Sequence, residues 1–252
     1  MPSAPNSSPC LLLALLCGLA AGCSYADRPD LRAGGLSQFA LVSSRPAPGE
    51  AGFPRAAPID LFFSDTPDAE TVADVDLRIY SGLIEAAGTV RVDLLERRLR
   101  MQPFRVLRPE LRHEVYLAGV IRGLNGAKLP ATVVFDFTTS ADEGSPAPAP
   151  PVVTGAELQP IWSQRCISCH SGAAPPMAVD LSSPEAARRT MRGLPSSAGP
   201  LLVAPGTHAK SYLMLKLLGE GGILGSPMPP DGPRLGSGEL RRVADWIDAG
   251  AP

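Results

Sequence analysis

Short runs in which apolar and polar residues alternate fill the chain between residues 55 and 140. Successive side chains of a β-strand point to opposite faces, so an alternation with period two predicts strands with one buried face. Glycine and proline separate the runs at the intervals of a β-sandwich, which predicts two packed antiparallel sheets over one core. The apolar positions of the four clearest runs are Ile59, Leu61 and Phe63; Val75, Leu77 and Ile79; Val90, Val92 and Leu94; and Val133, Phe135 and Phe137.

The end of the chain has helical periodicity instead. Ser237 is placed to cap this helix, and Gly250 and Pro252 are placed to end it. Trp246 is expected in the core beside it. The apolar positions follow the i, i+3, i+4, i+7 spacing of one buried helix face: Leu240, Val243, Ala244 and Ile247.

An earlier helix is expected near residue 160, where two signals conflict. Thr154 and Glu157 have the spacing of a capping box. Pro160 would disrupt a helix that runs through it, because proline lacks the N–H that the preceding turn requires. The favoured interpretation therefore places Pro160 in the first turn of a helix over residues 160–169 and leaves its capping groups unassigned.

A spacer rich in proline and alanine, "ADEGSPAPAPP", separates these two patterns and predicts an extended linker over residues 141–153. The chain is thus predicted to be multi-domain, with an all-β sandwich at 46–140 and an all-α domain at 154–252. The net charge of the 252 residues is −2, and basic residues are not clustered with aromatic ones. The composition therefore predicts no nucleic-acid partner.

Three of the five cysteines, Cys10, Cys17 and Cys23, lie in or directly after an apolar run near the start of the chain. This run is too short to span a membrane and has the length of an export signal. Its end, "LAAGCS", resembles the lipobox of bacterial lipoproteins. That resemblance implies a signal peptide at 1–22, a lipid on Cys23 and a tether at 23–45. Cleavage by ordinary signal peptidase is the alternative.

Cys166 and Cys169 remain as thiols, and His170 follows them directly in "CISCH". A disulfide between these cysteines would leave His170 unexplained. A thioredoxin-like motif expects a strand before the pair, but "VVTGAELQPIWSQ" does not alternate. A zinc site needs four ligands, and adjacent residues can hardly both reach one small ion.

Covalent attachment of haem explains all three residues of this motif. Two thiols separated by two residues can form thioethers with the haem vinyl groups, and the next histidine then binds the iron as the proximal ligand. Export agrees with this interpretation, since attachment takes place outside the bacterial cytoplasm. The sequence therefore predicts one covalent haem c held by Cys166 and Cys169, with His170 on the iron.

Met228 is the favoured ligand on the other face of the haem. It lies in "GSPMPPDG", a loop that proline keeps from being helical and in which a side chain can be held rigidly. Met191 and Met214 fall in helical windows and are expected to fill the core. Met177 is too close to His170 in the chain. His208 is the next candidate, but it is expected to be a solvated loop residue.

Residues 154–252 resemble the class I cytochrome c domains found in many bacterial lipoproteins. The resemblance rests on "CISCH", "VAPGTHAKSYL", "MPPDGPRL" and "ELRRVADWIDAGAP", in that order. It implies thioether anchors at Cys166 and Cys169, a proximal ligand at His170 and a distal ligand at Met228.

Residues 46–140 resemble the bacterial Ig-like domains of the SbsA type, on the stretch from "FSDTPDAETV" to "VVFDFTT". His113 stands where that family usually has a tyrosine. Arg97, Arg98 and Arg100 are expected to form a solvated face, and the segment has no catalytic constellation.

The sequence thus predicts an electron-transfer lipoprotein rather than an enzyme. It would lie at the bacterial cell envelope, facing the periplasm or the cell surface, and would bind the membrane through its N-terminal lipid. Its partners would be redox proteins. One alternative is an adhesion or scaffold protein in which the Ig-like domain is the working part. A haem peroxidase or sensor is another alternative, which requires an open sixth position on the iron.

Overall fold

The computed structural model describes residues 38–252. The predicted signal segment 1–22, the lipid site at Cys23 and the first part of the predicted tether therefore lie outside the described residues.

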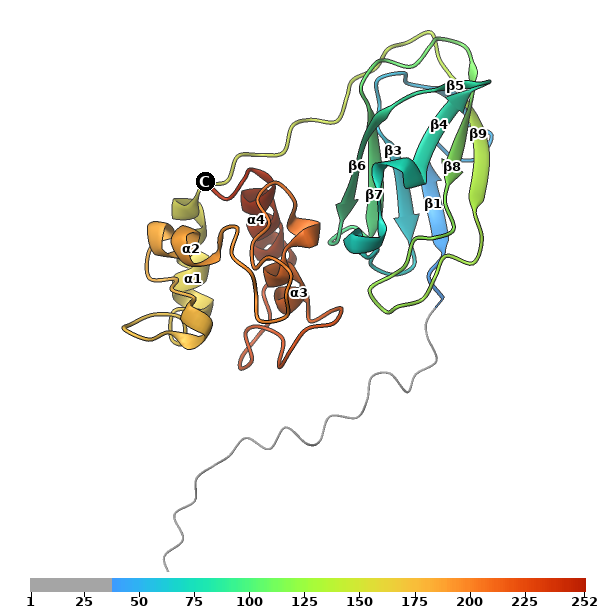
Figure 1. Ribbon diagram of the computed structural model, residues 1–252. Helices are drawn as coiled ribbons and strands as arrows, with labels where there is room; N and C mark the ends of the chain where they lie inside the picture. Colours follow the sequence, from blue (N-terminus) through green and yellow to red (C-terminus); the bar gives the residue numbers. More distant parts are fainter. Residues whose placement is uncertain (1–37) are drawn as a thin grey trace, which may run out of the picture. The chain divides into compact units, whose positions relative to one another are not determined.

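The first half of the described chain forms two β-sheets (Figure 1). One sheet has the strand order β1-β3-β7-β6, and the other has the order β2-β9-β8-β4-β5. Neighbouring strands are antiparallel except for β2 and β9, which are parallel. The strands are β1 Leu41–Arg45, β2 Ala51–Phe53, β3 Ile59–Phe63, β4 Leu77–Ser81, β5 Ile84–Glu85, β6 Gly88–Asp93, β7 Arg98–Pro103, β8 Arg112–Leu117 and β9 Val133–Thr139.

For most of these strands, the alternating pattern correctly predicts which side chains face the core. The side chains at 59, 61 and 63 of β3 are all buried, as are Phe135 and Phe137 of β9. Val75 is an exception, because it lies in a short 3-10 turn before β4 and is 57% exposed. The sandwich also begins before residue 46: β1 pairs with β3, and Phe39 stacks on Phe63 with ring centroids 4.9 Å apart.

The prediction that Arg98 and Arg100 form a solvated face is wrong. In the register of β3 and β7, Asp60 lies opposite Arg100, which donates two hydrogen bonds of 2.7 Å to its carboxylate. Arg98 lies 3.5 Å from the same carboxylate, which is buried. Arg97, at the turn before β7, is exposed as expected.

His113 of β8 is buried between the sheets, where it stacks on Phe137 of the paired strand. The ring centroids are 5.4 Å apart. Neither ring nitrogen makes a hydrogen bond of normal geometry within the described part of the chain. Burial lowers the pKa of His113, and the backbone of Arg108 offsets this shift only in part.

A smaller helical region follows, with α1 Gly155–Arg165, α2 Pro184–Met191, α3 Tyr212–Leu218 and α4 Ser237–Asp248. Helix α1 packs against α2 and α4, and Trp162 meets Trp246 edge to face at 6.5 Å. The predicted face of α4 is confirmed, since Val243, Ala244 and Ile247 are buried. The overall prediction of a β-sandwich followed by a helical region is therefore confirmed.

Both predicted helix starts require correction. Helix α1 does begin with the capping box: Thr154 accepts a hydrogen bond from the Glu157 N–H, and the Glu157 carboxylate accepts one from the Thr154 N–H. Pro160 lies inside the helix, on its exposed side. Helix α4 begins one residue earlier than expected, because Gly236 occupies the cap position and donates its N–H to Glu239.

The linker has no helix or strand, and part of it follows the sandwich. The Ala56 N–H donates to the Glu143 carbonyl at 2.7 Å, and the Ala147 N–H donates to the Gln102 side chain at 3.2 Å. No helix among residues 38–252 is long and apolar enough to cross a membrane.

The sandwich and the helical region belong to the same compact unit and share side chains in one core. Leu94, in the turn between β6 and β7, is 2% exposed and belongs to the core cluster of the helical region. Beside it, Arg241 of α4 pairs with Asp93 at 3.0 Å and with Glu96 at 3.3 Å. The turn from Asp93 to Arg98, called the docking turn below, thus joins the two parts.

Candidate functional site

The motif "CISCH" lies on a tight turn directly after α1. Helix α1 ends at Arg165, and Cys166 is its C-terminal cap, so the predicted helix over residues 160–169 extends too far. The N–H groups of Cys169 and His170 both donate to the Cys166 carbonyl, at 3.2 and 2.9 Å. The two cysteines and the histidine are therefore presented by one compact turn.

The two thiols of this turn are free and lie in different surroundings. Cys169 is exposed, while Cys166 is partly buried and packs against the helical core. Burial, together with the nearby carboxylate of Glu239, raises the pKa of Cys166 to about 11. Cys166 is therefore a neutral thiol at the edge of an apolar core.

The ring of His170 is oriented by a backbone carbonyl. Its Nδ1 lies 3.3 Å from the carbonyl oxygen of Val179. A carbonyl can only accept a hydrogen bond, so the proton is on Nδ1 and the lone pair is on Nε2. This is the arrangement that a metal-binding histidine requires, with one nitrogen fixed by a hydrogen bond and the other available as a ligand.

Met228 lies in the loop between α3 and α4, where its side chain is partly buried against the same core cluster that Cys166 contacts. Its N–H donates to the carbonyl of Lys216 in α3, at 2.7 Å. The Nζ of Lys216 donates to the carbonyls of Leu224 and Ser226, and the Leu224 N–H donates to the Tyr212 hydroxyl at 2.7 Å. Helix α3 thus holds the loop that carries Met228.

The other methionine candidates have the surroundings that the sequence predicts. Met191 and Met214 are buried in the helical core, at 1% and 0% exposure. Met177 is exposed and has a left-handed backbone, with φ of 56°.

The prediction that His208 is a solvated loop residue is wrong. Its side chain is buried, with Nδ1 2.8 Å from the Asp248 carboxylate and Nε2 accepting from the Leu94 N–H at 3.3 Å. Both ring nitrogens are thus engaged, so His208 is a structural contact to the docking turn. Burial would raise the pKa of Asp93 beside it, but the hydrogen bond and the positive charge of Arg241, together with the Glu96 N–H, lower it below its ordinary value.

The zinc alternative gains no support from the described residues. Within residues 38–252, no group of three or more histidine, cysteine, aspartate or glutamate side chains is arranged to hold a metal ion. The turn itself presents two thiols and one histidine nitrogen, the donor types that a covalently attached haem would use.

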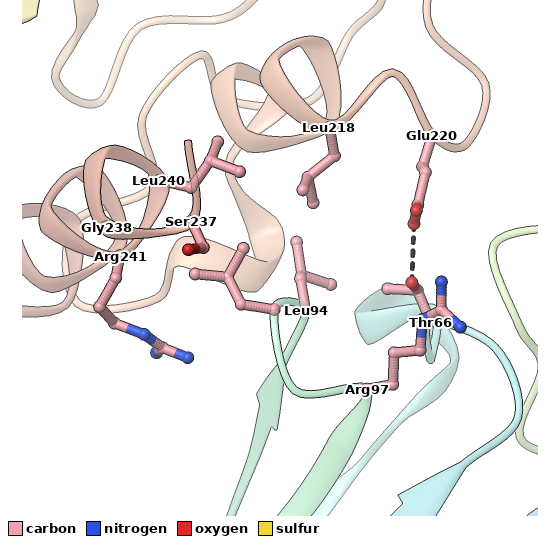
Figure 2. Close-up of a pocket in the computed structure, with 10 residues that line it drawn as sticks. Thr66, Leu94, Arg97, Leu218, Glu220, Ser237, Gly238, Leu240 and Arg241 are labelled. Carbon is pink, nitrogen blue, oxygen red and sulfur yellow. Dashed lines mark hydrogen bonds between the residues drawn. The ribbon is translucent and has the colours of Figure 1, made fainter. Parts of the chain in front are cut away.

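An open pocket of about 540 Å³ lies between the docking turn and the helical region (Figure 2). Leu94, Leu218 and Leu240 form much of its lining. At one side of it the Thr66 hydroxyl donates to Glu220 at 2.7 Å. Because Glu220 lies at the start of the Met228 loop, this bond links the sandwich to that loop.

Comparison with known proteins gives only loose similarity. No family model matches the chain, and no curated protein matches it at a significant level. Among solved structures, the N-terminal part of the bacterial S-layer protein SbsC matches 47% of this chain and 26% of its own, with 14% identity and a TM-score of 0.34. The chain thus spans about a quarter of that relative.

Two further solved structures match a similar share of the chain. The L,D-transpeptidase from Mycobacterium smegmatis matches 41% of each chain, with 18% identity and a TM-score of 0.31. PcoC, a methionine-rich copper resistance protein from Escherichia coli, matches 41% of this chain and all of its own, with 17% identity and a TM-score of 0.32. No function is inferred from likeness at this level.

Sequence reasoning missed Lys216, Tyr212 and Val179. Lys216 carried a signal, because it is the charged residue in the otherwise apolar stretch "SYLMLKLLG". A lysine in such a stretch extends its ammonium toward polar partners while its stem packs on apolar surface. Val179 contributes a backbone carbonyl, which side-chain patterns do not show.

Proposed function

We propose that this chain is a monohaem c-type cytochrome that carries electrons at the bacterial cell envelope. Cys166 and Cys169 would hold haem c through thioethers, and His170 and Met228 would bind the iron. The observation that carries this proposal is the His170 ring, whose Nδ1 faces the Val179 carbonyl so that Nε2 is the available ligand. It lies on the same turn as two free thiols.

Haem c supplies one-electron exchange at its iron. The chain's own residues would fix that group and limit its chemistry. Cys166 and Cys169 would hold the haem covalently, and the Val179 carbonyl would keep the proton of His170 on Nδ1. Met228 would be a second ligand to the iron, which would leave no place there for peroxide or dioxygen and would favour electron transfer over catalysis. In this proposal the helical region is a class I cytochrome c domain and the sandwich is an Ig-like domain.

The proposed location follows from the first residues of the chain, which lie outside the described part. "LAAGCS" supports a lipid on Cys23 and attachment to the membrane. Haem c attachment outside the cytoplasm agrees with export. Redox proteins of the same compartment would be the partners.

The decisive experiment is an optical spectrum of the exported protein, before and after denaturation and acidic extraction. Haem should stay with the polypeptide, because two thioethers hold it. Cys169→Ala should abolish normal maturation. Free haem in the extract, or bound zinc without haem, contradicts the proposal.

The Met228→Ala variant tests the carrier function separately. It should keep its haem, lower the reduction potential and bind carbon monoxide readily in the ferrous form, because the sixth position opens. Met177→Ala is the matched control: it removes an exposed methionine of the same region and should leave carbon monoxide binding unchanged. Rapid carbon monoxide binding and peroxide turnover by the unmutated protein would instead indicate a peroxidase or sensor.

In a second candidate function, the chain is an envelope adhesion or scaffold protein, and the sandwich is the part that binds partners. Three large apolar side chains are exposed at or close to β5: Leu83 at 103% precedes it, Ile84 at 54% is in it, and Phe104 at 67% donates its N–H to the carbonyl of Ala87, two residues after it. Exposed apolar groups that gather in one place mark interaction surfaces. A cellular role that survives Cys169→Ala but not Leu83→Asp with Phe104→Asp would favour this candidate.

A further inference from the structure

In the loop between α3 and α4, three glycines lie between Glu220 and Met228, at positions 221, 222 and 225. Gly221 and Gly225 have positive φ values of 72° and 71°, which glycine adopts without strain. Glycine also gives the unfolded loop many alternative conformations. A rigid Met228 therefore needs contacts from outside the loop.

Helix α3 supplies these contacts through Lys216. The ammonium donates to the Leu224 and Ser226 carbonyls, two residues apart on one side of Pro227. The backbone carbonyl of the same lysine accepts the N–H of Met228 on the other side. One residue therefore holds the chain immediately before and at Met228.

Tyr212, one helical turn earlier, adds a second contact from the same face of α3. Its hydroxyl accepts the N–H of Leu224 at 2.7 Å, and its side chain is buried. Both polar groups of the Leu224 backbone are thus bound by α3, one by Tyr212 and one by Lys216. Leu224 itself is 56% exposed, so apolar packing does not explain how this part of the loop is held.

We infer that Lys216 and Tyr212 are positioning residues that hold Met228 at the sixth coordination position. This inference rests on the proposed function, since it assumes that Met228 binds the iron. Hydrogen bonds to a charged donor are about twice as strong as neutral ones, which suits a clamp on a glycine-rich loop. Lys216 and Tyr212 touch neither the haem nor the iron in this scheme and act through the loop.

The test compares four variants of the full-length protein with covalently bound haem. Lys216→Leu keeps the apolar stem and helix propensity but removes the ammonium, and Lys216→Arg retains hydrogen-bond donors. Tyr212→Phe removes only the hydroxyl. Lys210→Leu is the matched control, because Lys210 is exposed and precedes α3.

Three readouts separate a positioning role from a general loss of stability: the ferric absorption band of methionine–iron ligation, the rate of ferrous carbon monoxide binding, and amide hydrogen exchange of the loop peptide. Lys216→Leu should weaken the band and speed carbon monoxide binding by about tenfold or more, since charged hydrogen bonds are lost. Tyr212→Phe should shift the same readouts in the same direction but less. Lys216→Arg and Lys210→Leu should resemble the unmutated protein.

Unchanged methionine ligation and loop exchange in both Lys216→Leu and Tyr212→Phe would overturn this inference and leave the proposed function standing. Unmutated protein without covalent haem would overturn the proposed function instead. If Lys216→Leu does not fold, Tyr212→Phe decides the matter through the same readouts.

Discussion

His113 is a titratable side chain enclosed between two sheets, where its ring stacks on Phe137. Burial disfavours the charged imidazolium, so the pKa of His113 falls below its ordinary value of 6.5. Below that pH the unfolded chain binds a proton that the folded chain does not. The stability linked to His113 is therefore full above pH 6.5 and is lost as the pH falls through the folded pKa.

His113→Phe should remove this acid-side loss of stability. Phenylalanine keeps an aromatic ring against Phe137 and has nothing to protonate. The check is the free energy of unfolding of both proteins from pH 7.5 to 5, a range set by the ordinary histidine pKa of about 6.5. If the free energy of unfolding changes equally with pH in the two proteins, His113 is protonated in the folded state as easily as in the unfolded one.

Residue patterns predict buried apolar positions better than they predict the environment of charged and polar ones. Leu61 and Phe63 were predictable because alternation alone assigns them to the core. His208, Arg98 and Arg100 were not, because their partners lie far away in the chain: Asp248 for the histidine and Asp60 for both arginines. A sequence pattern contains no sign of such pairs until the strand register and the helix packing are known.

Among the strand pairs, β3 and β7 are joined by a buried ion pair as well as by backbone hydrogen bonds. Asp60 faces Arg100 directly in the register, and its side chain is 7% exposed. Removal of this carboxylate would take from Arg100 both of its hydrogen bonds to Asp60, whereas Arg98 would keep its contacts with Asp93 and Glu96.

Asp60→Ala should therefore destabilise the protein by about 1.5–3 kcal/mol, the range for hydrogen bonds to charged groups. Asp136→Ala is the control: Asp136 bonds to Arg112 at the same 2.7 Å, but both side chains are exposed. Asp136→Ala should lower the free energy of unfolding by less than about 0.5 kcal/mol, as for exposed ion pairs. Denaturant unfolding of the two variants measures both values, and equal losses would contradict the role given to burial.

Element boundaries show where local signals compete. The capping box at Thr154 and Glu157 starts α1, although Pro160 removes the N–H of a later turn. Just before β4, Val75 continues the alternation, but it lies in a 3-10 turn in which the Asp76 carboxylate accepts the Ala73 N–H. Side chains that bond to nearby backbone therefore decide boundaries that periodicity alone places wrongly.

Leu94 and Ala69 are the buried side chains of the first half that belong to the core cluster of the helical region, and Leu94 is the larger of the two. Leu94→Ala should destabilise that region by about 2–5 kcal/mol, the range for a buried leucine. Fluorescence of Trp162 and Trp246, both in the helical region, reports its unfolding.

Leu83→Ala, at a fully exposed turn of the sandwich, is the control and should leave unfolding unchanged. If tryptophan fluorescence reports the same free energy of unfolding for Leu94→Ala and Leu83→Ala, the docking turn does not stabilise the helical core. This shared core was beyond sequence reasoning, which treats the two segments as separate domains because the linker and the change of periodicity separate them.

From the place of the docking turn in the chain, we expect the sandwich to form before the helical region packs on it. The sandwich is made first, and nearly all of its own core comes from residues before the linker. At that stage Leu94 has no helical partner and lies at the tip of an already paired hairpin. Helices α3 and α4, which are short and only marginally stable alone, then meet a preformed apolar template when they emerge. A circular permutant that places residues 154–252 ahead of the sandwich would lose this template and should acquire its helical structure more slowly.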